Sequence, residues 1–443
     1  MSSTQKSVLG AVPSEWKVVE LRDLGSWGGG KTPRKSNQEY WNGETPWASP
    51  KDMGGPVVHR TEDHVTQVAL SEENLTVYDP GSVMVVFRSG VLRHTFPVAT
   101  CNRPFTVNQD MKVLTPGSEV DNRFAFYLID HLGPVVLQKA TKVGTTVESV
   151  DTDSFMSLSV GVPRLDEQHR IADVLDTVDA AIQETDRAVE KQEQVKTGLL
   201  QDLLTRGLDA DGRLRDPERE PEAFREVKHF GKIPRDWTVT RLVELVPRAD
   251  YGISSSLDYG RETPVLRMNN LDDGEVVLND VKSSDDPKAK ELLLEPNDVL
   301  FNRTNSKEHV GRTAIWRGQV EQMSFASYLV RLVPDENRLN PEYLNLWLNW
   351  PRTQLAIRQF ATPGVSQVNI NPTNLRKTLI ALPKSVNEQR RIVAAANRHR
   401  EWIKSEQAYR EKLRRLKTGL MQDLLTGRVR VLEVEDRVDE LVA

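Results

Sequence analysis

The sequence carries the stretch KTGLLQDLLT at residues 196–205 and KTGLMQDLLT at residues 417–426, 221 positions further along the chain. Nine of the ten letters agree. The same offset aligns identical residues elsewhere: Pro13 with Pro234, Trp16 with Trp237, Leu21 with Leu242, Leu24 with Leu245, and Glu167-Gln168 with Glu388-Gln389. Because one register holds across so many separated positions, the chain is a tandem duplication.

Each copy has two parts. The first part is turn-rich, with short apolar bursts between Gly, Pro and Asn clusters, which predicts strands joined by loops. The second part contains no proline in its long helical stretch and has a sustained helical period. We therefore predict two related α/β domains at 1–165 and 233–385 and long helices at 166–206 and 386–430. A polar linker at 207–232 and an acidic tail at 431–443 complete the chain. The predicted fold class is α+β.

The helical stretches show the heptad seam of a coiled coil, with apolar ends and a more polar middle. In the second copy a neighbouring track through Trp402 is more apolar, so the seam there is open to a shift of one residue. An amphipathic helix that lies on its own domain is the alternative. The predicted seam residues are Ile171, Leu175, Val178, Ile182, Leu199, Leu203, Ile392, Ile403, Tyr409, Leu413, Leu420 and Leu424.

The order of the parts predicts the direction of the helices. The first helix leads from the first domain to the second, and the second helix starts at the second domain. To pack side by side they must run antiparallel, with the domains at opposite ends. A helix of about 40 residues spans about 60 Å. The sequence thus predicts two domains that are separated by an antiparallel coiled coil.

Composition limits the class of protein. The chain has 443 residues, a formal net charge of −5 and one cysteine, Cys101. The charge argues against a sequence-blind basic DNA coater but not against a reader with local basic loops. A single cysteine excludes disulfides within the chain and cysteine-built zinc cages. No apolar run approaches the roughly 20 residues of a membrane span, and we expect a cytoplasmic protein.

The stretch GSWGGGKT, residues 25–32, matches the phosphate-binding pattern G-x-x-x-x-G-K-[ST]. Such a loop needs a buried strand before it and a helix that begins at the Lys-Thr pair. Here a charged segment precedes it, and Pro33 and Arg34 follow without helical period. We therefore interpret the match as an accident of a Gly-rich turn. Trp41 and Trp47, further along, are expected to anchor a loop or the core.

Catalytic motifs are missing from the sequence. There is no N/D-P-P-[FY] tetrapeptide, as adenine methylation would need, and no HExxH pattern or cysteine cluster. The eight histidines are scattered. We expect no catalytic residue, no metal site and no cofactor site in this chain.

Several stretches resemble the specificity subunits of Type I restriction-modification enzymes. GGGKTP and EYWNGETPWASPKDM resemble the opening of a target recognition domain in that family. FRSGVLR (87–93), TPVLRMNNL (263–271) and DVLFNRTNS (298–306) are similar to other stretches of those domains. VPRLDEQHRI and LPKSVNEQRRI resemble the lead-in to the family's long helices, and the duplicated decapeptides resemble their ends. The resemblance covers nearly the whole chain in the family's order.

This resemblance implies a non-catalytic subunit that reads double-stranded DNA. Each recognition domain would read one half of a split target, and the helices would act as spacer and as docking site for two methyltransferase subunits. Two restriction subunits join in systems that also cut, and the sequence leaves open whether this one does. S-adenosylmethionine, ATP and magnesium are expected on the partner subunits, where adenine N6 is methylated. No membrane partner is expected.

Base contacts favour Arg for guanine and Asn for adenine, and Lys and Arg contact phosphates. Candidate residues are those of these types that lie beside glycine and away from apolar strand positions. In the first copy they are Lys31, Arg34, Lys35, Lys51, Arg88 and Arg93. In the second they are Arg261, Arg267, Asn269, Asn270, Arg303, Asn305, Lys307 and Arg312. For each one, simple surface solvation is the alternative.

Two other functions stay open at this point. A nucleotide-binding enzyme would use Gly25–Thr32 as a phosphate loop. A coiled-coil scaffold would use its two domains to bind other proteins. Duplex DNA binding that depends on both salt and sequence would exclude the scaffold.

Overall fold

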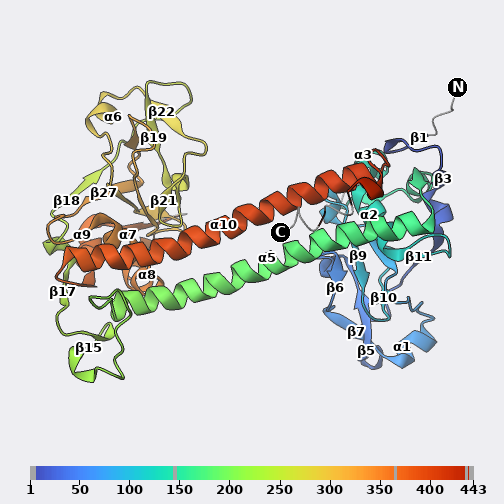
Figure 1. The fold of residues 1–443 in the computed structure, drawn as a ribbon, viewed down its shortest axis with the longest axis horizontal. Coiled ribbons are helices and arrows are strands. Elements are labelled where there is room, and N and C mark those ends of the chain that lie inside the picture. Colours follow the sequence, from blue (N-terminus) through green and yellow to red (C-terminus); the bar gives the residue numbers. More distant parts are fainter. Residues whose placement is uncertain (1–5, 143–146, 364–366, 435–437, 439–443) are drawn as a thin grey trace. The chain divides into compact units, whose positions relative to one another are not determined.

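The computed structural model describes residues 6–142, 147–363, 367–434 and 438, and it divides into two compact units. The first unit comprises Met1–Arg187 and Gln407–Ala443, and the second comprises Ala188–Glu406. Each unit therefore combines one of the two α/β domains with one half of each long helix. The ribbon and the element labels are shown in Figure 1.

The first domain is built on two sheets. The larger sheet has the order β4 (Gly25–Gly29), β11 (Met111–Pro116), β8 (Val83–Val86), β9 (Val98–Cys101) and β6 (Val57–Val58). The smaller has the order β10 (Thr106–Val107), β5 (Trp41–Ala48) and β7 (Asp63–Val65). The pairs β10–β5 and β6–β9 are parallel, and the other pairs within these sheets are antiparallel.

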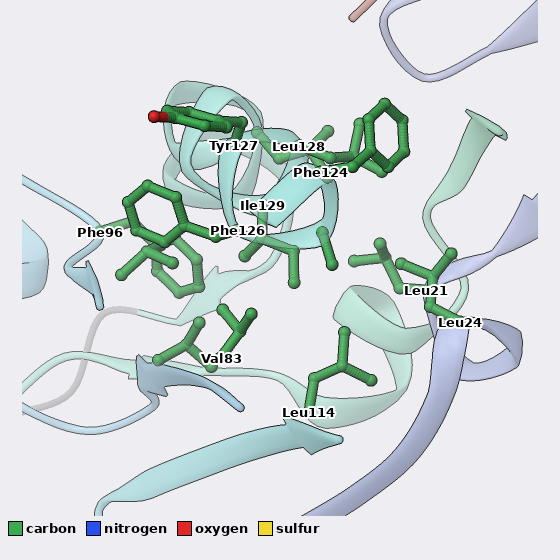
Figure 2. Close-up of a cluster of buried hydrophobic side chains, with 14 of the residues drawn as sticks. Leu21, Leu24, Val83, Phe96, Leu114, Phe124, Phe126, Tyr127, Leu128 and Ile129 are labelled. Carbon is green, nitrogen blue, oxygen red and sulfur yellow. The ribbon is translucent and has the colours of Figure 1, made fainter. Parts of the chain in front are cut away.

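Helix α2 (Asn122–His131) packs its apolar residues on the larger sheet. Its residues from Phe124 to Ile129 are all buried, and Asp121 caps its first turn by accepting from two backbone N–H groups. Figure 2 shows these side chains packed near Val83 and Leu114. Buried apolar area of this kind is the main favourable term in folding. The other helices of this domain are α1 (Gln67–Glu72), α3 (Gly133–Lys139) and α4 (Thr152–Met156).

Three short strand pairs complete the first domain. They are β1 (Lys6–Ser7) with β2 (Gly10–Ala11), β12 (Thr141–Lys142) with β13 (Ser149–Val150), and β3 (Lys17–Glu20) with β14 (Ser159–Val162). The β3–β14 pair joins the beginning of the domain to the strand that precedes the first long helix.

The second domain repeats this plan. Its larger sheet has the order β18 (Arg248–Tyr251), β27 (Leu329–Val333), β23 (Val299–Asn302), β25 (Thr313–Ile315), β21 (Glu275–Val276) and β20 (Leu271–Asp272). The smaller has the order β22 (Lys282–Ser284), β19 (Thr263–Leu266) and β26 (Ser324–Phe325). The pairs β19–β26 and β21–β25 are parallel, as are their counterparts in the first domain. The duplication in sequence is thus a duplication in topology.

The remaining elements of the second unit follow the same plan with additions. A third sheet has the order β24 (Thr304–Asn305), β29 (Val368–Ile370) and β28 (Ala361–Pro363), and β17 (Thr238–Arg241) pairs with β30 (Leu379–Leu382). The helices are α6 (Pro287–Glu291), α7 (Pro341–Asn349), α8 (Pro351–Arg358) and α9 (Pro372–Leu375). By position, α7 and α8 correspond to α2 and α3.

The long helices are α5 (Leu165–Thr205) and α10 (Val386–Leu424). In the first unit Lys417 pairs with Asp179 at 2.7 Å and Arg410 with Asp186 at 3.1 Å, so residue numbers rise on α5 as they fall on α10. In the second unit the end of α5 and the start of α10 share one apolar cluster. The helices are therefore antiparallel in both units, as predicted. Helix α10 ends earlier than the predicted residue 430, and the chain then turns at Gly427, whose φ is +70°.

Most of the predicted seam residues are shielded from solvent. Nine are buried: Ile171, Leu175, Val178, Leu203, Ile392, Ile403, Leu413, Leu420 and Leu424. Ile182, Leu199 and Tyr409 are half-buried. Trp402, which lies on the alternative track, is 40% exposed, so the seam at this point passes through Ile403. His399 reinforces the contact in the second unit, where its Nε2 lies 3.0 Å from the carbonyl oxygen of Gln192.

The predicted polar linker, 207–232, is packed on the second unit. Leu208 and Phe230 are buried in its core, and Phe224 is buried as well. The segment contributes β15 (Phe224–Val227) and part of its partner β16 (Gly231–Pro234). The sequence pattern did not predict this packing, because the apolar residues of the segment stand alone among many charged ones. Of the predicted tail, residues 435–437 and 439–443 lie outside the described residues, while Val431 is buried. No helix in the described part of the chain is long and apolar enough to cross a membrane.

Candidate nucleic-acid interface

The Gly-rich stretch forms the edge strand β4 and not the predicted turn. It pairs antiparallel with β11 along its whole length. A Cβ atom at Gly30 would lie 1.7 Å from the carbonyl oxygen of Val107, and one at Gly25 would lie 2.3 Å from that of Thr115. The glycines therefore allow close approach of neighbouring backbone. No α-helix begins at Lys31-Thr32, so the phosphate-loop geometry is absent from this stretch.

Two tryptophans hold the loop that follows β4. The Nε1 of Trp47 donates to the carbonyl oxygen of Lys31 at 3.1 Å, and that of Trp41 donates to the carbonyl oxygen of Arg34 at 3.4 Å. The two indoles pack edge to face, with ring centroids 5.3 Å apart. The expectation that these tryptophans anchor a loop is thus confirmed. The loop presents Arg34 and Lys35 on the surface.

The cationic candidates of the first domain fall into two groups. Lys31 pairs with Glu73, Lys51 with Glu62 and Asp63, and Arg93 with Glu148. The hydrogen bond from Lys51 to Glu62 is the first cause that raises the pKa of Lys51, and that from Arg93 lowers the pKa of Glu148. The second group comprises Arg34, Lys35 and Arg88, which are exposed and make no side-chain hydrogen bond or ion pair to any described residue. This second group keeps its charge available for a ligand.

In the second domain, Asn270 is buried and structural. Its Nδ2 donates to the carbonyl oxygens of Val277 and Asn279 at 3.0 and 2.7 Å, and its Oδ1 accepts from the backbone N–H of Arg267 at 2.9 Å. Its amide is therefore occupied in shaping the turn. Tertiary structure alone distinguishes it from its neighbour Asn269, which is exposed.

Arg267 and Arg261 are both paired with carboxylates. Arg267 lies 2.7 Å from Asp280, and Arg261 lies 3.6 Å from Asp285. The hydrogen bond from Tyr259 is the first cause that lowers the pKa of Asp280, followed by that from Arg267. These arginines are partly neutralised.

The loop after β23 carries the remaining candidates. Arg303 is half-buried, and Asn305 accepts from the backbone N–H of Ser306 at 2.8 Å. Lys307 and Arg312 are exposed, and within the described ranges their side chains have no hydrogen-bonding or ionic partner. The structure thus brings Arg303, Asn305 and Lys307 to one strand end.

Sequence reasoning missed the role of two glutamines. Gln168 and Gln389 are fully buried at the starts of α5 and α10. Gln168 donates to the carbonyl oxygens of Glu119 and Pro163, both at 2.9 Å, and accepts from the backbone N–H of Asp121 at 2.8 Å. Gln389 makes the same three bonds to Arg338, Pro383 and Asn340. Each glutamine fixes a recognition domain to its helix, and the repeated Glu-Gln pair was the available signal.

The adjoining glutamates bind arginines that follow the opposite helix. Glu388 makes two bonds to Arg215, at 2.7 and 3.1 Å, and Glu167 makes two to Arg430, both at 2.9 Å. The Glu388–Arg215 pair lies within the second unit, and the Glu167–Arg430 pair lies within the first. Specific ion pairs therefore hold the glutamate in the first turn of each long helix.

An ionisable cluster around the buried Tyr127 joins α2 to both long helices in the first unit. The hydroxyl of Tyr127 donates to Asp176 at 2.7 Å and to Asp179 at 2.9 Å, and Lys417 also binds Asp179. Burial is the first cause that raises the pKa of Tyr127, so its hydroxyl remains a proton donor. These groups are mutually satisfied, and the cluster holds helices together.

Comparison with known proteins identifies relatives of this arrangement. Residues 13–192 and 234–415 each match the family described as Type I restriction modification DNA specificity domain. The chain is 37% identical, over 166 residues, to the specificity subunit of the Type I restriction enzyme EcoR124I/EcoR124II of Escherichia coli. That alignment covers 37% of this chain and 41% of the relative. The chain matches about half the length or less of the first curated relatives.

Other relatives match along most of their length. The MjaVIII specificity subunit of Methanocaldococcus jannaschii is 23% identical over 434 residues, which covers 95% of this chain and 94% of the relative. A Type I restriction-modification S subunit from M. genitalium has a similar fold, with a TM-score of 0.56 at 12% identity. The structural alignment covers 96% of that subunit and 94% of this chain.

A second solved structure comes from work on complex assembly and conformational transition of the type I R-M system. Its TM-score is 0.57 at 17% identity, over 94% of this chain and 99% of that one. The two matched segments of this chain correspond to its two structural repeats. The chain therefore belongs to the Type I restriction modification DNA specificity family, with two target recognition domains.

Proposed function

We propose that this specificity subunit reads a split target in double-stranded DNA, one half with each recognition domain. The observation that carries the proposal is that the two domains share a topology while the side chains at a matched strand end differ in chemistry. At the residue after the central strand, the first domain has the buried Phe87 and the second has the half-buried Arg303. Two surfaces of different chemistry suit two half-targets of different sequence.

We further infer that α5 and α10 set the separation of the half-targets and carry the docking surfaces for two methyltransferase subunits. Their outward residues, such as Glu190, Lys191 and Arg415, are exposed. The partner subunits bring S-adenosylmethionine, and restriction subunits bring ATP and magnesium where the system also cuts. This chain performs no chemistry and supplies the choice of site.

The test is a methylome of cells that express the chain with its methyltransferase subunit. We expect methylated adenines in two short half-targets that are separated by a fixed number of unread bases. A continuous target, or methylation whose position does not depend on this chain, would contradict the proposal.

The helix part of the proposal has its own test. One heptad inserted near the middle of each helix adds about 10 Å, which equals about three base pairs at about 3.4 Å each. We expect the unread spacer to lengthen accordingly. A matched control replaces one existing heptad by another of equal length, and the spacer should then stay the same. An unchanged spacer after insertion would show that the helices do not set it.

A further inference from the structure

Arg303 occupies a rigid position at the end of strand β23. Its backbone N–H donates to the carbonyl oxygen of Tyr328 at 2.9 Å, and its own carbonyl oxygen accepts from Ile370 at 2.8 Å. The next two residues pair with β29, so the chain is held on both sides where it leaves the sheet. The Cα position of Arg303 is therefore fixed by the fold.

The guanidinium group is fixed as well. Its Nη2 donates to Oδ1 of Asn369 at 3.0 Å, and its Nη1 lies 3.5 Å from the carbonyl oxygen of Ser327. Asn369 is itself oriented, because its Nδ2 donates to Thr304 Oγ1 at 2.8 Å. The guanidinium carbon lies 5.1 Å from the ring centroid of Tyr251, at the distance of a cation–π contact. One N–H on each terminal nitrogen remains available to a ligand.

No carboxylate among the described residues lies within ion-pair distance of Arg303. All of its supports are neutral: an amide, a carbonyl and an aromatic ring. Arg267 and Arg261 in the same domain, by contrast, each pair with an aspartate. A cation that is held in one orientation without a counter-charge is prepared for an acceptor outside the chain.

The surroundings suit a nucleic acid. Tyr251 and Tyr328 are 47% and 46% exposed beside the arginine. Asn305 and Lys307 follow on the same loop. Aromatic, amide and cationic side chains together are the usual composition of a surface that meets DNA bases and phosphates.

We propose that Arg303 reads a guanine in the half-target of the second domain, through paired hydrogen bonds to O6 and N7. Guanine presents these two acceptors side by side in the major groove, which matches the two free N–H groups. Asn369 is then a positioning residue, and Tyr251 supports the guanidinium from one side. The inference rests on the proposed function, since it assumes that this domain contacts DNA.

The experiment uses the complete methyltransferase complex with R303A, R303K or the wild-type chain. Binding is measured on a panel of duplexes in which each base pair of the second half-target is changed in turn. We expect R303A to lose about 10- to 100-fold of discrimination at one G·C pair and to leave the other positions unchanged. R303K keeps the charge but loses the paired geometry, so it should lose discrimination at the same pair.

Lys307→Ala is the matched control, since Lys307 is exposed on the same loop and has no side-chain partner among the residues that the structure describes. This variant should weaken binding to all duplexes alike, and its affinity should fall less steeply with rising salt concentration. N369A should reduce discrimination at the pair that R303A identifies. Thermal unfolding of each variant complex checks that it is folded, and R303K replaces R303A if the alanine variant is not.

The outcomes are distinct. A uniform loss with a flatter salt dependence in R303A would make Arg303 a phosphate contact and overturn the inference. A second half-target without a G·C pair, or unchanged discrimination in folded R303A and R303K, would overturn it as well. A wild-type complex without any split target would instead overturn the proposed function.

Discussion

The two recognition domains build the same sheet around different interiors. In the second, Arg331 of β27 is buried, 2.8 Å from Asp250 on one neighbouring strand and 3.3 Å from Asp298 at the start of the other. In the first, the matching residue of β11 is Val113, which is opposite Gly28. The five strands from β4 to β6 are arranged as those from β18 to β21, and the second sheet adds β20. Backbone pairing and apolar cover therefore determine this topology, and the interior tolerates either an ion-pair network or apolar packing.

The ion-pair network in the second domain has an electrostatic consequence. Burial raises the pKa of Asp298 above its ordinary value, although Arg331 opposes the shift. Removal of two charges from water is expensive, and a buried pair is stable only while both partners remain. The second domain should therefore be the more sensitive of the two to substitution at this position.

We expect the largest loss of stability from a substitution that breaks this ion-pair network. Arg331→Met leaves the partly buried Asp298 without its cation and leaves Asp250 with only the exposed Arg248 as a partner. It should lower the free energy of unfolding by about 3 kcal/mol. Adding Asp250→Asn and Asp298→Asn removes the stranded charges and should recover at least half of the loss. Hydrogen exchange should place the loss in the second unit. If the triple variant is less stable than the single one, the unpaired carboxylates are not the main cause of the lost stability.

Loss of either buried glutamine should lower the free energy of unfolding by a smaller amount, which should be equal in the two domains. Gln168→Ala and Gln389→Ala each leave buried backbone groups without partners, which should lower the free energy of unfolding by about 2–3 kcal/mol. Gln183→Ala on the same helix α5 is the control, because Gln183 is exposed. Chemical denaturation measures all three variants. A large difference between the two glutamines would show that the anchors are not equivalent.

The arginine–glutamate pairs should also contribute differently to the stability of the two domains. The side chain of Arg215 is 16% exposed, whereas that of Arg430 is 37% exposed. Arg215→Ala should lower the free energy of unfolding by about 2 kcal/mol, because it strands the buried Glu388. Arg430→Ala should lower it by about 1 kcal/mol or less, as for surface pairs. The reverse order in chemical denaturation would contradict the burial argument.

The smallest effect concerns acid stability in the first domain. Arg93 holds the pKa of Glu148 below its ordinary value of 4.5. This pair therefore adds stability above that value, and the contribution is lost as pH falls through the lowered pKa. Glu148→Gln should be slightly less stable than the wild type at pH 7, and the difference should vanish at low pH. Melting curves across pH measure it, and a gap that widens on acidification would refute the assignment.

Sequence patterns predicted the elements that have a period or a repeat. The duplication, the two long helices and most of their seam could be read from residues such as Ile171 and Leu424, because a helix buries residues at fixed spacing. The packing of 207–232 could not be read, since Leu208 and Phe230 stand alone among charges. Nor could the sequence distinguish Asn270, whose amide is occupied, from Asn269, because both belong to one tripeptide turn.

The sequence by itself determined that the chain is two related domains with two heptad-patterned helices, because periodicity and repetition are local properties of the letters. Only the tertiary structure decided which cations keep their charge free, which glutamines fix domain to helix, and that Arg303 is held on neutral supports. Those properties depend on contacts between residues far apart in the chain, such as Arg303 with Asn369 and Glu167 with Arg430. No local pattern encodes such contacts.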